Sequence, residues 1–173
     1  SASTETKRGP DEFNSVTTTH QAIRNLYESP WQIALCLTGG GSRVASDMLS
    51  VPGGSGTILD VSIPYSNASL AQYLGRVPDQ YCPRETALSM ATVAWQRALH
   101  LSVSSDSVAS HCLGVSCTAS LVSSQPKRGE HRIWIATDSA SSSRVLSLVL
   151  KKGLRSRIEE EAVAADILLY AIC

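Results

Sequence analysis

Residues 33–42 read Ile33-Ala34-Leu35-Cys36-Leu37-Thr38-Gly39-Gly40-Gly41-Ser42. The first five of these residues form an apolar run that is too short for a helix, which predicts a buried strand. Three glycines follow, and Ser42 is a suitable N-cap for a short helix that we expect to end at Leu49. A strand, a glycine turn and a helix start together direct free backbone N–H groups at an anion or a carbonyl oxygen. The alternative is a tight turn without a ligand, because short glycine motifs are weak signals by themselves.

The rest of the chain alternates between helical and strand-like patterns. We expect helices over residues 17–28, 68–74, 84–101 and 154–172, and strands over residues 57–63, 112–116, 132–137 and 145–150. Asn67 is the expected cap of the second of these helices, and Gly75 is expected to end it. Interleaved helices and strands predict an α/β fold, a single layered domain in which helices pack on a sheet. Residues 1–15 are polar and predict a flexible N-terminal arm, which leaves residues 16–173 as the domain.

Composition narrows the classes of partner and compartment. The chain has 173 residues with 15 basic and 15 acidic side chains, and this balance argues against nucleic acid or a membrane surface as a partner. No apolar run reaches about 18 residues, and the N-terminus lacks a signal-peptide core. The five cysteines form no C-x-x-C pair, which argues against a metal site. Free thiols in a reducing, cytoplasmic compartment are the simplest interpretation.

Five motifs follow one another in a characteristic order. They are Leu37-Thr38-Gly39-Gly40, Val51-Pro52-Gly53-Gly54-Ser55, Pro64-Tyr65-Ser66-Asn67, Met90-Ala91 and Pro126-Lys127-Arg128-Gly129. In this order and spacing the chain resembles the CinA C-terminal domain family, as a divergent member of eukaryotic type. That family includes enzymes that hydrolyse the carboxamide of nicotinamide mononucleotide to nicotinate mononucleotide and ammonia. The resemblance implies a small nucleotide ligand, no cofactor, a homo-oligomer, and an association with a nucleotidylyltransferase.

The resemblance also assigns roles to residues. It places the catalytic positions at Cys36, Ser55 and Tyr65, and the substrate-binding positions at Thr38, Gly39, Gly40, Ser116 and Arg155. Two residues of the family pattern are replaced, a glutamate by Leu35 and a lysine by Leu70. In such hydrolases the lysine takes the proton of the nucleophile, and leucine cannot do so. Lys127 or His131 would have to supply a base from another part of the chain.

Two hypotheses therefore stay open. Cys36 is either a thiol that replaces the family serine or a buried cysteine that behaves as a small apolar residue. The chain is correspondingly an amidohydrolase with a divergent catalytic set, or an inactive CinA-like domain that binds a nucleotide or serves as an oligomerisation or regulatory module. Arg155 is expected to bind a phosphate or to pair with Glu159. The run Glu159-Glu160-Glu161 is expected to be an exposed helix face.

Overall fold

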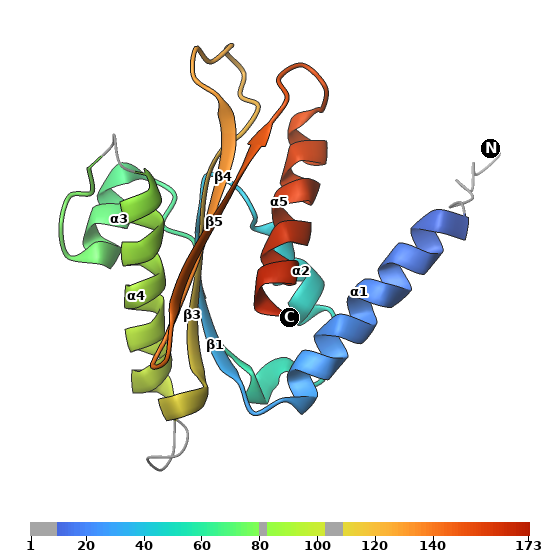
Figure 1. Ribbon diagram of the computed structural model, residues 1–173, viewed down its shortest axis with the longest axis vertical. Helices are drawn as coiled ribbons and strands as arrows, with labels where there is room; N and C mark the ends of the chain where they lie inside the picture. Colours follow the sequence, from blue (N-terminus) through green and yellow to red (C-terminus); the bar gives the residue numbers. More distant parts are fainter. Residues whose placement is uncertain (1–9, 80–82, 103–108) are drawn as a thin grey trace, which may run out of the picture.

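The computed structural model describes residues 10–79, 83–102 and 109–173 (Figure 1). Its elements are α1 (Pro10–Glu28), β1 (Gln32–Thr38), α2 (Arg43–Leu49), η1 (Gly54–Gly56), β2 (Ile58–Ser62), α3 (Asn67–Leu74), α4 (Pro83–Leu101), η2 (Ala109–His111), β3 (Cys112–Ser120), β4 (His131–Ser139), β5 (Ser143–Leu150) and α5 (Arg157–Ile172). Within the described part of the chain, no helix is both long and apolar enough to cross a membrane.

The strands form one mixed sheet with helices on both faces. The strand order is β2-β1-β3-β4-β5, with β1 parallel to β2 and β3, and with β4 antiparallel to β3 and β5. Helices α3 and α4 lie on one side of the sheet, while α1, α2 and α5 lie on the other (Figure 1). The predicted α/β fold, a single layered domain with helices packed on a sheet, is confirmed.

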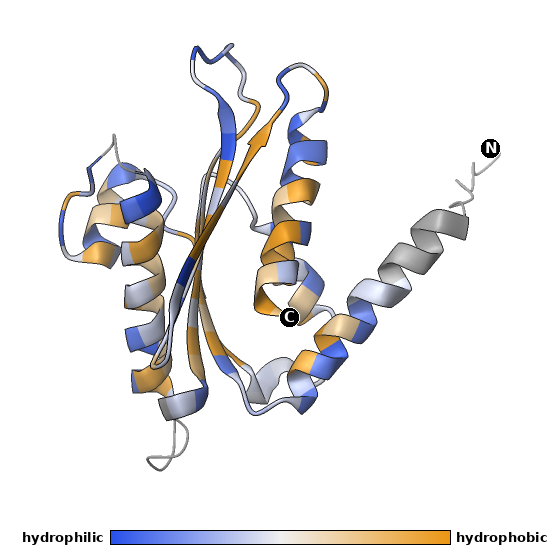
Figure 2. Ribbon diagram, in the orientation of Figure 1, coloured by the Kyte–Doolittle hydropathy of each residue, from blue (hydrophilic) through white to orange (hydrophobic). Residues whose placement is uncertain are grey.

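Strand β1 is apolar and buried from Ile33 to Leu37, because both of its faces are covered there. Its side chains alternate between two layers of the core. Ile33, Leu35 and Leu37 belong to the large cluster that contains residues of α1, α2 and α5. Ala34 and Cys36 belong to a second cluster against α4. The hydropathy colouring shows the apolar strips of α4 and α5 on either side of the sheet (Figure 2).

Small side chains set the distance between α4 and the sheet. Gly114 of β3 lies so close to α4 that an added Cβ would be 2.1 Å from the carbonyl oxygen of Ala91 and 2.3 Å from the backbone nitrogen of Trp95. The facing residues Ala94 and Ala98 are fully buried. A larger residue at position 114 would force the helix away from the strand.

Several predicted boundaries need correction. Helix α1 begins at Pro10, so the part of the expected arm from residue 10 to residue 15 is helical, while residues 1–9 lie outside the described residues. Strand β3 continues to Ser120 because its last residues pair with β4, a partner that local polarity does not reveal. Ser66, not Asn67, is the N-cap of α3, since its hydroxyl accepts a hydrogen bond from the N–H of Ser69. Gly75 is the C-cap of that helix, as predicted.

The last helix also begins later than expected. Helix α5 starts at Arg157, and Ser156 is its N-cap in a capping box. The Ser156 hydroxyl accepts from the N–H of Glu159, and the Glu159 carboxylate accepts from the N–H of Ser156. Local capping chemistry therefore decided the boundary, and Arg155 lies in the loop before the helix.

Candidate functional site

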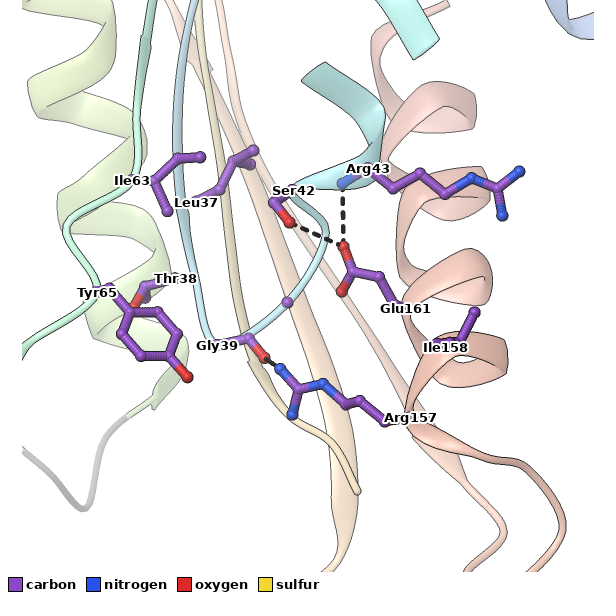
Figure 3. A pocket seen from close by; sticks show the side chains of 11 residues that line it. Leu37, Thr38, Gly39, Ser42, Arg43, Ile63, Tyr65, Arg157, Ile158 and Glu161 are labelled. Atoms are coloured by element: carbon purple, nitrogen blue, oxygen red, sulfur yellow. Dashed lines mark hydrogen bonds between the residues drawn. The ribbon is translucent and has the colours of Figure 1, made fainter. Parts of the chain in front are cut away.

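A pocket of about 260 Å³ lies at the carboxyl ends of β1 and β2 (Figure 3). Its walls are formed by the glycine turn after β1, the segment after β2, the start of α2 and the first turns of α5. The sequence-predicted residues Thr38, Gly39, Gly40 and Tyr65 line it. Tyr65 is 77 % exposed, so its side chain is available to a ligand at the pocket.

The glycine turn is held by a carboxylate from the last helix. Glu161 of α5 accepts hydrogen bonds from the N–H of Gly41 at 2.8 Å and from the N–H of Arg43 at 3.0 Å. A third hydrogen bond to this carboxylate comes from the hydroxyl of Ser42, which donates at 3.3 Å (Figure 3). The side chain of Ser42 makes no capping bond, so the predicted cap position is right but the cap itself comes from Glu161. The turn does bind an anion, and the anion is part of the protein.

The expectation that the run of glutamates is an exposed helix face is confirmed only for Glu159, and it is wrong for Glu160 and Glu161. Glu160 is 0 % exposed, and its carboxylate accepts from the N–H of Val122 at 2.7 Å and lies 2.8 Å from Nδ1 of His131. Glu159 belongs to the capping box, and Glu161 is half-buried at the glycine turn. His131 is therefore engaged with a structural partner and does not line the pocket.

Two arginines line the pocket: Arg43, which pairs with Asp47 at 3.8 Å, and Arg157, which sequence reasoning missed. The guanidinium of Arg157 donates to the carbonyl of Gly39 at 2.9 Å (Figure 3). It also donates to the carbonyl of Val122 at 3.0 Å. Among the described residues it pairs with no carboxylate, so its charge is not neutralised locally. The predicted Arg155 is not a lining residue of the pocket. Two backbone carbonyls thus fix the orientation of a guanidinium whose remaining N–H groups are available.

Gly39 closes the turn against β3. It has φ +76°, and an added Cβ would lie 2.1 Å from the carbonyl oxygen of Ala119. Both the positive φ and the close approach require glycine, as the sequence predicted for this turn. The carbonyl of Gly39 consequently points to Arg157, which links the turn to α5.

Cys36 lies on the other side of the sheet from the pocket residue Leu37. Its side chain is fully buried in the cluster against α4, and burial raises the pKa of its thiol to about 12, partly opposed by the neighbouring hydroxyl of Tyr73. Leu70 packs against the same cluster. The two positions that the resemblance matches to a nucleophile and a base therefore meet in one apolar cluster.

The remaining predicted residues are distributed over the molecule. Ser55 is exposed in η1, which precedes β2 and lies at the opposite end of the parallel strands from the pocket. Ser116 is buried in β3, where its hydroxyl donates to the carbonyl of Ala87 at 2.6 Å. Lys127 donates to the Ser120 hydroxyl. The structure does not bring Ser55, Ser116 or Cys36 to Tyr65.

Two signals in the sequence point to the missed residues. The motif from Ser156 to Glu159 has the capping-box spacing, which would have placed the start of α5 correctly. Arg157 and Glu161 are four residues apart and so share a helix face. No group of three or more metal-ligating side chains suited to a metal ion occurs in the described part of the chain.

No protein-family model matches this chain, and no curated protein matches it by sequence. Solved structures do match. The competence/damage inducible protein CihA from Agrobacterium tumefaciens has a TM-score of 0.63 at 19 % identity, with 89 % of this chain and 94 % of that chain covered. A CinA superfamily protein from Klebsiella pneumoniae has a TM-score of 0.66 at 12 % identity, with coverages of 92 % and 95 %. A CinA superfamily protein from Escherichia coli has a TM-score of 0.61 at 14 % identity, with coverages of 97 % and 92 %.

The chain has a CinA-like fold. The likeness extends over nearly all of the chain and of each structure, so the resemblance seen in the motifs is confirmed as a likeness of fold. At these identities it carries no activity from the CinA proteins to this chain.

Proposed function

We propose that this chain is a CinA-like domain that binds a nucleotide such as nicotinamide mononucleotide in the pocket beside Tyr65 and does not hydrolyse its amide. One observation carries this proposal. The matched nucleophile and base positions, Cys36 and Leu70, pack in an apolar cluster away from the pocket. A thiol with a pKa near 12 is almost entirely protonated at neutral pH and is a poor nucleophile.

Two backbone donors at the glycine turn are already occupied, which disfavours amide hydrolysis there. A tetrahedral intermediate requires N–H groups aimed at the developing oxyanion. At this turn the N–H groups of Gly41 and Arg43 are bound to Glu161. These two donors are therefore not available to an oxyanion.

The features that favour binding remain in the pocket. Arg157 offers a guanidinium held by two carbonyls and free of a carboxylate partner among the described residues, which suits a phosphate. The exposed ring of Tyr65 offers a surface for a planar base or pyridine ring. A volume of about 260 Å³ is at the small end for ligand sites and suits a mononucleotide better than a dinucleotide.

An active amidohydrolase is the second candidate. It is favoured by the position of Tyr65 and Thr38, which lie together at the pocket as the resemblance implies. In that case the base would come from a group that the sequence pattern does not identify.

Two assays on the purified chain separate these candidates. Calorimetric titration with nicotinamide mononucleotide measures binding, and ammonia release with chromatography of the nicotinate product measures hydrolysis. We expect binding without ammonia. Arg157→Ala should weaken binding by roughly 10- to 100-fold, as expected for loss of a charged hydrogen bond, while Arg155→Ala should leave the affinity unchanged. Turnover of the nucleotide would support the amidohydrolase instead, and failure of the nucleotide to bind would remove the proposal.

A further inference from the structure

Strand β5 forms one edge of the sheet. It pairs with β4 on its inner side, and no strand of the described residues pairs with its outer side. Exposed edge strands are usually protected by lysine, proline or a bulge, because their free N–H and C=O groups attract another strand. Arg144 near the start of β5 is the one charged residue of the strand, and the segment from Val145 to Leu150 contains no charged residue and no proline. This edge is therefore open to strand addition.

The sequence of β5 is self-complementary. Residues 145–149 read Val145-Leu146-Ser147-Leu148-Val149, which is the same in both directions. If two copies pair antiparallel about Ser147, every residue meets one of its own kind. Leu146 then lies opposite Leu148 of the partner subunit, and Val145 lies opposite Val149 of the partner subunit. Cross-strand apolar pairs of this kind stabilise a sheet on both faces.

The faces of the strand agree with this register. Leu146 and Leu150 belong to the cluster on the α5 side, whereas Val145 belongs to the cluster on the α4 side. Paired residues in a continuous sheet must share a face, and pairing about Ser147 meets this requirement at every position. A slip by one residue would place a residue of the α4 side opposite one of the α5 side.

Two apolar side chains of β5 are exposed in the single chain. Leu148 is 39 % exposed and Val149 is 46 % exposed, one on each face of the sheet. The arrowhead end of β5 has the hydrophobic colour in Figure 2. Addition of a second β5 would cover both side chains and would pair the free backbone groups in the same step.

We propose that the chain forms a two-fold symmetric dimer in which β5 pairs antiparallel with β5 of a second copy about Ser147. The two five-stranded sheets then become one continuous sheet of ten strands. The interface is isologous, because the same strand serves both subunits. The proposal does not depend on any ligand in the pocket.

Cysteine cross-linking tests the register. Ser147 is exposed and lies on the two-fold axis, so Ser147→Cys should form an intermolecular disulfide under mild oxidation, seen as a dimer on a non-reducing gel. Ser143→Cys is the matched control on the same strand. In the proposed register, position 143 and the same position of the partner subunit are eight residues apart along the strands, about 27 Å at 3.4 Å per residue. Cysteines at these two positions should not cross-link. A cross-link at residue 143 without one at residue 147 would overturn this register, as would no cross-link at either residue.

Charge pairing tests the interface in solution. Light scattering after size exclusion should give a dimer for the wild type. Ser147→Glu and Ser147→Lys each place like charges opposite one another and should weaken the dimer at least about tenfold. An equimolar mixture of the two variants should restore a dimer, because the charges are then opposite. A monomeric wild type, or dimers unaffected by both substitutions, would overturn the proposal. Circular dichroism of each variant should match the wild type, since the side chain is exposed.

Discussion

The carboxylate of Glu161 accepts a hydrogen bond from the backbone N–H of Gly41 at 2.8 Å, although the two residues are 120 positions apart. The same side chain also binds the N–H of Arg43 and the hydroxyl of Ser42. The last helix therefore supplies the anion that the glycine turn is built to bind. This relationship ties α5 to the turn after β1 and fixes one wall of the pocket.

Removal of this carboxylate should destabilise the protein. Glu161→Ala leaves donors at the start of α2 without their charged partner, and we expect the free energy of unfolding to fall by roughly 1–3 kcal/mol. Glu161→Gln should have a smaller effect, because the amide oxygen still accepts a hydrogen bond. Urea unfolding monitored by circular dichroism measures both. Asp166→Ala is the control, since Asp166 is exposed on the same helix, and its effect should stay within about 0.5 kcal/mol. Equal losses at residues 161 and 166 would contradict this role of Glu161.

The buried pair of Glu160 and His131 should matter more than the surface pair beside it. Glu160→Ala leaves the imidazole of His131 and the N–H of Val122 without their partner in a buried site, and we expect a loss of about 3–5 kcal/mol. Glu160→Gln should lose less, because its amide oxygen still accepts from Val122. Glu130→Ala removes an exposed ion pair with Arg132 and should change the stability by less than about 1 kcal/mol. Hydrogen exchange at the amide of Val122 provides a local readout, and unchanged protection there in Glu160→Ala would count against the pair.

Gly39 should not tolerate a side chain. In Gly39→Ala the new Cβ would meet the carbonyl oxygen of Ala119 at 2.1 Å, and the backbone would keep an unfavourable φ of +76°. We expect a loss of at least about 2 kcal/mol together with weaker ligand binding, because the carbonyl that orients Arg157 would move. Gly129→Ala is the matched control, since an added Cβ there meets no atom within 4 Å. Thermal unfolding of the two variants compares them directly, and similar melting temperatures would refute the steric argument.

The stability of the protein should decrease in alkaline solution, in part through Cys36. In the unfolded chain this thiol loses its proton near its usual pKa of 9.0, whereas in the folded protein burial holds the pKa at about 12. Between pH 9 and pH 12 the unfolded state therefore binds fewer protons, and the free energy of unfolding falls as pH rises. The contribution is fully present below pH 9. For a single group the slope cannot exceed about 1.4 kcal/mol per pH unit.

Cys36→Ala should flatten this dependence. Urea unfolding at several pH values between 8 and 11 measures how the free energy of unfolding changes with pH. The smaller side chain of the variant lowers the free energy of unfolding by the same amount at every pH, so it does not affect this slope. Cys173→Ala should change the slope less, since that thiol is exposed. Parallel curves for the wild type and Cys36→Ala would mean that the Cys36 thiol titrates at its usual pKa in the folded protein.

Local patterns in the sequence were sufficient to predict most elements of the fold. The apolar run before the glycines predicted β1, because a strand covered on both faces needs apolar side chains at every position. The glycine at position 39 was predicted for its positive φ, which the structure confirms. The order of the motifs predicted the CinA-like fold. Four of the residues predicted for the site, Thr38, Gly39, Gly40 and Tyr65, line the pocket, since they lie at or just after the ends of the neighbouring parallel strands β1 and β2; their roles stay a prediction.

Only the tertiary structure decided what fills and surrounds the site. Glu161 and Arg157 reach the glycine turn across more than 110 residues of chain, and no local pattern encodes a contact of that length. The same holds for Glu160 of α5, which is buried against His131 of β4. The sequence by itself determined where strands, turns and helices form, because these depend on neighbours in the chain. The tertiary structure decided which charges meet and which are buried, because those depend on packing between distant segments.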